Sequence, residues 1–204
     1  DETEPQCSLK QIELFREMQE KIVDSYHSIK WVHIANSAGT SLINQDRGNL
    51  FRLGIAMYGQ PPSPNHPGSP ELQEAITWKT SISQLKIFPK GSPISYGRTF
   101  VTSNEMKIAT LAVGYADGYS RLLSNKAEVL VNGKRARVVG RVCMDMIMVD
   151  VSEIEDVRLH DEVVLIGKQG EEYISATELA DIIGTINYEV VCNISSRVPR
   201  VYLN

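Results

Sequence analysis

The strongest constraint on the fold is a proline-rich stretch, QPPSPNHPGSP, at residues 60–70. Its five prolines and one glycine favour an irregular connection, because proline lacks the amide hydrogen that helices and sheet interiors need. Apolar residues before the stretch follow helical and then strand-like spacing, whereas short alternating patterns dominate after it. The sequence therefore predicts two domains, residues 1–70 and residues 71–204.

The first region has the pattern of an α/β unit. Residues 8–28 place apolar side chains at helical spacing, and Ser8 is a plausible N-cap. Strand-like runs follow at 31–38 and 50–57, separated by a polar connection. A helix and two strands in this order are typical of parallel strands in an α/β fold.

The second region reads as mainly antiparallel β-structure. Asn132 and Gly133 stand between two alternating runs, which is the strongest short-range signal for a β-hairpin. The expected strands share short, apolar, β-branched runs: AITWKTSISQLKIF, KIATLAVGY, AEVLV, ARVVGRV, MIMVDV and DEVVLIG.

One helix is expected inside the β region, at residues 175–185. Ser175 and Thr177 are the candidate N-caps, and Gly184 is the candidate C-cap. The sequence contains no internal repeats.

Composition excludes several classes of partner. The 204 residues are 42% hydrophobic and 23% charged, with a formal charge of −4, which gives no electrostatic reason to expect nucleic acid or a membrane surface. No apolar run approaches the roughly 20 residues of a spanning helix, and no signal peptide is expected. Three cysteines far apart in the sequence predict free thiols in a reducing compartment, hence a cytoplasmic protein, and no metal is expected.

Two segments of the first region carry polar residues suited to an anion. Ser37 follows a predicted strand and leads toward a helix start, a geometry that also binds phosphate. Arg52 lies in the apolar run FRLGIAMYG and therefore needs an acceptor, and Gly54 would let backbone amides approach an anion. In (β/α)8 barrels the loops after the last two strands often form a phosphate site. The residues alone leave open that Ser37 is only a cap and Arg52 only a structural ion pair.

Several motifs together resemble the alanine racemase family, which uses pyridoxal 5'-phosphate (PLP). The resemblance implies the last part of a (β/α)8 TIM-like barrel, followed by a C-terminal, mainly antiparallel β domain. In order along the chain the motifs are HIANSAG, RLGIAMYG, PISYGRTF, AVGYADGYSR, VVGRVCMDMIMVDV, INYEVVCNIS and SRVPRVY.

The resemblance implies a cofactor site in the first region. Ser37 corresponds to the serine that holds the cofactor phosphate, together with backbone amides of Gly54 and Ile55. Arg52 corresponds to the arginine that faces the pyridine nitrogen of PLP. His33 corresponds to the histidine that forms a hydrogen bond with that arginine.

The resemblance also implies catalytic and substrate-binding residues in the second region. Tyr96 corresponds to the catalytic tyrosine, and Tyr115 and Met144 to residues near the substrate carboxylate. The family forms homodimers in which these residues reach the site of the other subunit. Four further positions correspond to the channel by which substrate enters: Asp1, Arg121, Arg141 and Ile194.

Other readings of these residues stay open. Tyr96 is one of eight tyrosines, and a half-buried tyrosine at a domain boundary is a common structural feature. Asp117 and Asp145 could form a carboxylate pair, although turn or cap roles suit their motifs better. Cys143 fits a buried thiol better than a nucleophile. Some family members have a phosphate-binding tyrosine where this chain has Ser196.

The predicted function is PLP-dependent interconversion of L- and D-alanine by two proton carriers, which supplies D-alanine for peptidoglycan. The family's Schiff-base lysine has no counterpart motif here, so the N-terminal half of the barrel is expected to be absent and this chain inactive alone. A racemase for serine or lysine, and a non-catalytic β module that binds a partner, are the alternatives.

Overall fold

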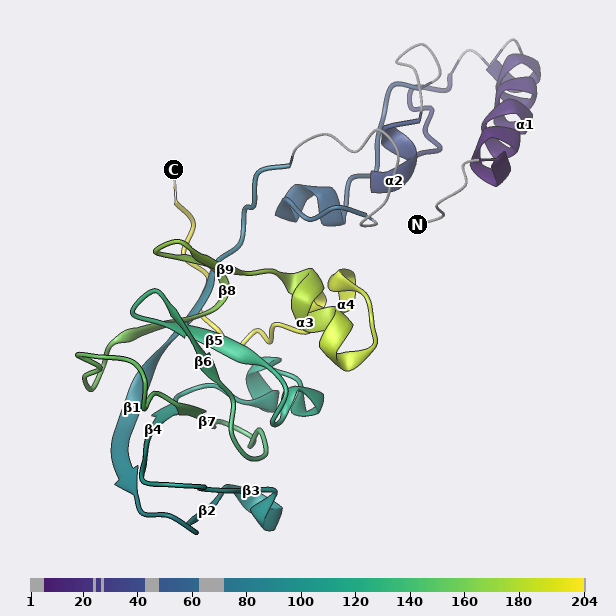
Figure 1. Cartoon of the computed structure of the whole chain (residues 1–204). Coiled ribbons are helices and arrows are strands. Elements are labelled where there is room, and N and C mark those ends of the chain that lie inside the picture. Colours follow the sequence, from purple (N-terminus) through teal and green to yellow (C-terminus); the bar gives the residue numbers. More distant parts are fainter. Residues whose placement is uncertain (1–5, 24, 27, 43–47, 63–71, 204) are drawn as a thin grey trace. The chain divides into compact units, whose positions relative to one another are not determined.

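The computed structural model describes residues 6–23, 25–26, 28–42, 48–62 and 72–203. The chain separates into two compact units, Asp1–Ala75 and Ile76–Asn204 (Figure 1), which we call the N-terminal unit and the β unit. The predicted boundary between residues 70 and 71 lies outside the described residues.

The N-terminal unit contains helix α1 (Gln6–Val23), the single turn α2 (Ser37–Thr40) and the 3-10 turn η2 (Ile55–Tyr58). Helix α1 confirms the helix predicted at 8–28 but not its ends. It begins at Gln6, two residues before Ser8, which is therefore not its cap, and it ends at Val23. The hydroxyl of Ser25 donates to the carbonyl oxygen of Lys21 at 2.9 Å. This side-chain bond competes with the helical pattern and accompanies the end of the helix.

The strands predicted at 31–38 and 50–57 are not formed in the described residues. The two segments are joined by single bonds, from the Asn49 amide to the Val32 carbonyl at 3.0 Å and from the Arg52 amide to the Ala35 carbonyl at 3.1 Å. A parallel strand takes hydrogen bonds from neighbours on both sides. Isolated bonds of this kind do not make a ladder, and the ends of both segments turn into α2 and η2.

The β unit is built on one antiparallel sheet with the strand order β6-β5-β8-β1-β4-β7, and β9 pairs with β8. A separate short pair joins β2 to β3. The strands are β1 (Trp78–Phe88), β2 (Pro93–Ile94), β3 (Phe100–Val101), β4 (Met106–Leu111), β5 (Glu128–Val131), β6 (Lys134–Arg137), β7 (Ile147–Asp150), β8 (Glu162–Gln169) and β9 (Glu172–Ile174).

The sheet closes on itself. Strand β1 pairs with β8 through its first half and with β4 through its second half, with a bulge between Ile82 and Gln84 (Figure 1). An antiparallel bridge between Val138 and Val149 brings the segment after β6 onto β7, the far end of the strand order. Strand β8 buries five consecutive residues, so both of its faces are covered, because successive side chains of a strand point to opposite faces.

Turns and helices of the β unit follow local signals. Asn132 and Gly133, both with positive φ, connect β5 to β6 and confirm the predicted hairpin. Helix α3 (Ala176–Ile183) is capped by the Ser175 side chain and ends at Gly184, within the predicted range. Helix α4 (Asn187–Cys192) was not predicted.

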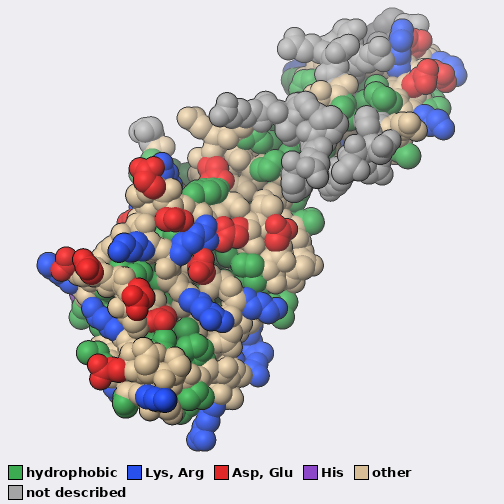
Figure 2. Space-filling view, viewed as in Figure 1, with side chains coloured by type: hydrophobic (Ala, Val, Ile, Leu, Met, Phe, Trp, Pro, Cys, Tyr) green, Lys and Arg blue, Asp and Glu red, His purple; other side chains and the backbone are tan. Residues whose placement is uncertain are grey.

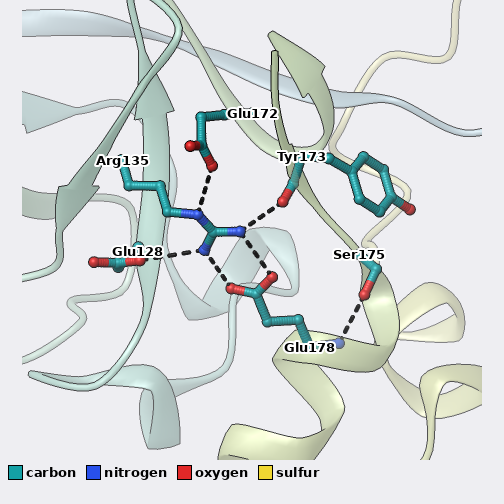
Figure 3. A network of polar contacts seen from close by, with 6 residues as sticks. All are labelled: Glu128, Arg135, Glu172, Tyr173, Ser175 and Glu178. Atoms are coloured by element: carbon teal, nitrogen blue, oxygen red, sulfur yellow. Dashed lines mark hydrogen bonds and ion pairs between the residues drawn. The ribbon is translucent and has the colours of Figure 1, made fainter.

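Arg135 on β6 joins three parts of the β unit (Figure 3). Its guanidinium lies 3.2 Å from Glu128 on β5, 2.9 Å from Glu172 on β9 and 2.7 Å from Glu178 on α3. It also donates to the backbone carbonyl of Tyr173 at 2.6 Å. The bonds to these carboxylates, led by Glu178, raise the pKa of Arg135, so this cluster is a structural tie.

The surface of the β unit has mixed charge. Figure 2 shows acidic and basic side chains intermingled on the face in view. None of the helices in the described part has the length and apolar character needed to cross a membrane. Nor does that part of the chain bring together three or more histidine, cysteine, aspartate or glutamate side chains that could hold a metal ion.

Candidate functional site

Ser37 links the two polar segments of the N-terminal unit. Its hydroxyl oxygen accepts hydrogen bonds from the Gly54 amide at 2.8 Å and the Ala56 amide at 3.4 Å. Asn36 caps α2 by accepting from the Gly39 amide at 2.9 Å, so Ser37 is not the cap residue. A serine hydroxyl has two lone pairs and one hydrogen. With both lone pairs used, Ser37 keeps its O–H to donate to an anion, which fits the phosphate of PLP.

Arg52 and His33 form the second polar contact of this unit. Arg52 Nη1 lies 2.7 Å from His33 Nδ1, and Arg52 Nη2 donates to the Ile34 carbonyl at 3.3 Å. Because arginine only donates, Nδ1 of His33 accepts and the ring is neutral with its hydrogen on Nε2. Arg52 is exposed within this chain, and the apolar surroundings expected for it in the complete barrel stay a prediction. It remains a permanent cation that two partners orient.

Tyr96 begins the 3-10 turn η3 (Tyr96–Arg98) between β2 and β3. Ser95, Gly97 and Arg98 all have positive φ, with values of 65°, 72° and 50°. Such a run is rare for non-glycine residues. The Tyr96 side chain is 75% exposed, so a strained turn presents a phenol at the surface of the β unit.

Tyr115 and Met144 are held together by their backbones. The Tyr115 amide donates to the Cys143 carbonyl at 3.0 Å, and the Ala116 amide donates to the Met144 carbonyl at 2.9 Å. Gly114 permits this approach, because a Cβ there would lie 2.4 Å from the carbonyl oxygen of Cys143. The turn η4 (Tyr115–Asp117) and the loop before β7 are therefore closely packed and hydrogen-bonded to each other.

The segment Gly140–Met144 also reaches the Tyr96 turn. The hydroxyl of Ser95 donates to the Arg141 carbonyl at 2.7 Å, and a Cβ on Gly97 would lie 3.0 Å from Arg141 Nε. Since the same segment bonds to the Tyr115 turn, the Tyr96 turn and the Tyr115 turn are both attached to it.

The remaining positions implied for the channel have separate surroundings. Arg121 opens the 3-10 turn η5 (Arg121–Leu123), and its carbonyl accepts from the Ser124 hydroxyl at 2.5 Å. Ile194 is 8% exposed and packs against the Gly118 turn, where a Cβ would lie 2.9 Å from its Cα. Asp1 lies outside the described residues.

Asp117 and Cys143 take the structural roles that their motifs favour. Asp117 Oδ2 accepts from the Gly114 amide at 2.9 Å, and Asp117 Oδ1 lies 3.4 Å from Arg197 Nε. The Asp117 carbonyl accepts from the Ser195 amide at 2.9 Å. The Cys143 thiol is buried and donates to the Arg141 carbonyl at 3.5 Å.

Comparison with known families decides the relationship. Residues 75–202 match the family described as "Alanine racemase, C-terminal domain", and residues 1–62 match "Alanine racemase, N-terminal domain". The chain belongs to the alanine racemase family. A curated alanine racemase from Halothermothrix orenii is 48% identical over 204 residues, which are 100% of this chain and 54% of that protein.

Solved racemase structures agree in fold. The alanine racemase from Bacillus anthracis with bound L-Ala-P has a TM-score of 0.88 and 44% identity, over 100% of this chain and 53% of its own. The alanine racemase from Bartonella henselae with covalently bound pyridoxal phosphate has a TM-score of 0.78 and 29% identity. The match covers 97% of this chain and 52% of the Bartonella chain.

These likenesses confirm the fold class: the last part of a (β/α)8 barrel followed by a mainly antiparallel β domain. The chain spans about half the length of the curated alanine racemases that it matches.

Sequence reasoning missed Ser95, which precedes Tyr96 and binds the Arg141 carbonyl. A positive φ at a serine leaves no mark in the local sequence. The one signal that could have pointed to it is the motif VVGRVC, which is distant in sequence but contacts Ser95 through Gly140 in the folded chain.

Proposed function

We propose that the protein acts, as part of a complete alanine racemase chain, in the PLP-dependent interconversion of L- and D-alanine. One observation carries the proposal beyond family membership: the segment Gly140–Met144 joins the Tyr96 turn to the Tyr115 turn. We further propose a cytoplasmic homodimer whose site is shared between subunits and whose D-alanine supplies peptidoglycan.

The residues of the N-terminal unit suit the cofactor. The Ser37 O–H and the backbone around Gly54 and Ile55 would hold its phosphate. Arg52, oriented by His33, would face the pyridine nitrogen. PLP, when bound, supplies an electron sink that stabilises negative charge at the substrate Cα. A guanidinium keeps its own proton, so Arg52 would not protonate the ring nitrogen, and the weaker electron sink would disfavour side reactions such as transamination.

Tyr96 is the proposed proton carrier on one face of the substrate Cα. Inversion requires an acid on one face and a base on the other. The second carrier would be the cofactor-binding lysine of the family, which we place in the half of the relatives that this chain does not span. We therefore propose that the 204 residues alone do not racemise alanine.

Tyr115 and Met144 are proposed to hold the carboxylate end of alanine. Tyr115 is bonded to the backbone of Cys143, and Met144 to that of Ala116, so the two contacts would keep a fixed separation while a proton moves at Cα. Arg121, Arg141 and Ile194 are proposed to line the channel through which substrate enters.

The test follows hydrogen exchange at Cα of each alanine enantiomer in D2O, using the complete chain loaded with PLP. Tyr96→Phe should lower racemisation by about 100-fold or more, with exchange lost for one enantiomer and kept for the other. Tyr173→Phe, on β9, is the matched control and should behave as wild type. Equal exchange of both enantiomers in Tyr96→Phe would remove Tyr96 from the reaction, and an inactive wild-type holoenzyme would contradict the proposed function.

A further inference from the structure

We propose that Ser95 is a positioning residue for the proposed reaction, because it holds a strained backbone that aims Tyr96. The inference rests on the proposed role of Tyr96 as a proton carrier. Ser95 has φ 65° and ψ −178°, a region that is essentially restricted to glycine. Strain of this kind persists only where surrounding contacts enforce it, and it collects at functional sites.

Three contacts enforce the conformation of Ser95, one of them between its hydroxyl and the Cys143 thiol at 3.5 Å. Its hydroxyl donates to the Arg141 carbonyl at 2.7 Å. Its Cβ faces Gly140, where an added Cβ would lie only 2.7 Å away. The serine is therefore fixed both by a hydrogen bond and by direct packing on a neighbouring loop.

The position of that loop explains why the fixation matters. The Arg141–Met144 segment also bonds to the Tyr115 turn, through the Cys143 and Met144 carbonyls. Ser95 is thus the point at which the Tyr96 turn is tied to the proposed substrate contacts. Tyr96 itself is 75% exposed within this chain, so the backbone on either side of it sets its direction.

Glycine would adopt the same φ and ψ without strain, but it would supply no hydroxyl and would allow many other conformations. A serine here costs stability and gains a defined geometry. Ser95→Gly and Ser95→Ala separate the two effects, because glycine removes both the strain and the bond, whereas alanine removes the bond alone.

The experiment uses the complete chain loaded with PLP. For Ser95→Gly we expect kcat to fall about tenfold or more with a smaller change in KM, while Tm stays the same or rises by about 2–4 °C. For Ser95→Ala we expect a similar fall in kcat and a lower Tm. Loss of stability and of activity in parallel in Ser95→Gly would show a merely structural residue and would overturn the proposal.

Amide hydrogen exchange gives a readout that does not depend on activity. Residues 96–98 should exchange about fivefold faster in Ser95→Gly, with the rest of the β unit unchanged. Ser92→Ala is the matched control, because it removes a hydroxyl bond to the Pro89 carbonyl of 2.7 Å and should leave kcat and the exchange of 96–98 as in wild type. Wild-type exchange in Ser95→Gly would refute the inference. If the wild-type holoenzyme proved inactive, the proposed function would fail, and the exchange data would still decide whether Ser95 fixes the turn.

Discussion

Two arginines show how differently the two units use the same side chain. Arg135 of the β unit is bound by three carboxylates and a carbonyl from β5, β9 and α3. Arg52 of the N-terminal unit is exposed and contacts only the neutral ring of His33 and one carbonyl through its guanidinium, as far as the described residues show. The positive charge of Arg135 is compensated by carboxylates within the fold, whereas that of Arg52 remains available for a ligand.

The backbones of the two units differ in the same way. In the β unit, proposed site residues lie on turns packed so closely that one added carbon atom would collide with a neighbour, as at Gly114. In the N-terminal unit, single hydrogen bonds such as that from Gly54 to Ser37 hold the polar residues. The proposed site residues are therefore positioned by packing in the β unit and by individual polar groups in the N-terminal unit.

Gly114→Ala should have the largest effect, because its Cβ would lie 2.4 Å from a backbone oxygen that cannot move freely. We expect about 3 kcal/mol or more of lost unfolding free energy. The matched change Gly54→Ala, whose Cβ would lie 3.8 Å from Ser37 Oγ, should cost less than about 1 kcal/mol. Urea unfolding followed through Trp78 in a Trp31→Phe background measures the cost of Gly114→Ala in the β unit, and unfolding followed through Trp31 in a Trp78→Phe background measures the cost of Gly54→Ala in the N-terminal unit. Equal costs would contradict the contrast between the units.

Arg135→Ala should lower the unfolding free energy of the β unit by about 1–3 kcal/mol, because it leaves Glu128, Glu172 and Glu178 without their shared cation. The exposed pair of Arg16 and Glu20 on α1 supplies the control, and Arg16→Ala should cost about 0.5 kcal/mol or less. Denaturant titration of both variants measures the difference. A cost for Arg135→Ala no greater than that for Arg16→Ala would show that the cluster is not a structural tie.

Arg52→Glu should change the reaction rather than the stability. A carboxylic acid at this position could give a proton to the cofactor ring, which would strengthen the electron sink. We expect transamination relative to racemisation to rise about tenfold, equivalent to about 1.4 kcal/mol, measured as pyruvate formed per D-alanine in the complete holoenzyme. An unchanged ratio would reject the proposed role of Arg52.

Tyr119→Phe should have the smallest effect, and it should raise the unfolding free energy, whereas Gly114→Ala and Arg135→Ala should lower it. The Tyr119 hydroxyl is buried, finds no partner among the described residues, and lies on a ring that packs edge-on against Trp78. Burial, with a smaller contribution from Glu178, raises the pKa of this phenol. Because an unsatisfied buried hydroxyl is costly, its removal should raise the unfolding free energy by about 1 kcal/mol. A less stable Tyr119→Phe protein in the same urea assay would argue against an unpaired hydroxyl.

The same contrast explains what the sequence could predict. The hairpin at Asn132 and Gly133 and the caps of α3 at Ser175 and Gly184 depend on the conformations of a few neighbouring residues, so they were predicted correctly. The strands expected at 31–38 and 50–57 depend on hydrogen bonds from other strands, and apolar runs alone did not form them.

Site residues divide along the same line. The resemblance pointed to Tyr96, Tyr115 and Met144, but the residues that fix them could not be found from local patterns. The backbone conformation of Ser95 is enforced by contacts with Gly140 and Arg141, which lie more than forty positions away in the chain.

The most direct test of the account is a crystal structure of the complete chain with PLP bound. We expect the phosphate within hydrogen-bond distance of the Ser37 hydroxyl, the pyridine nitrogen beside Arg52, and the Tyr96 hydroxyl of a partner subunit facing the reactive carbon. A structure in which ordinary side chains fill the space beside Arg52, with Tyr96 turned away from it, would contradict the account.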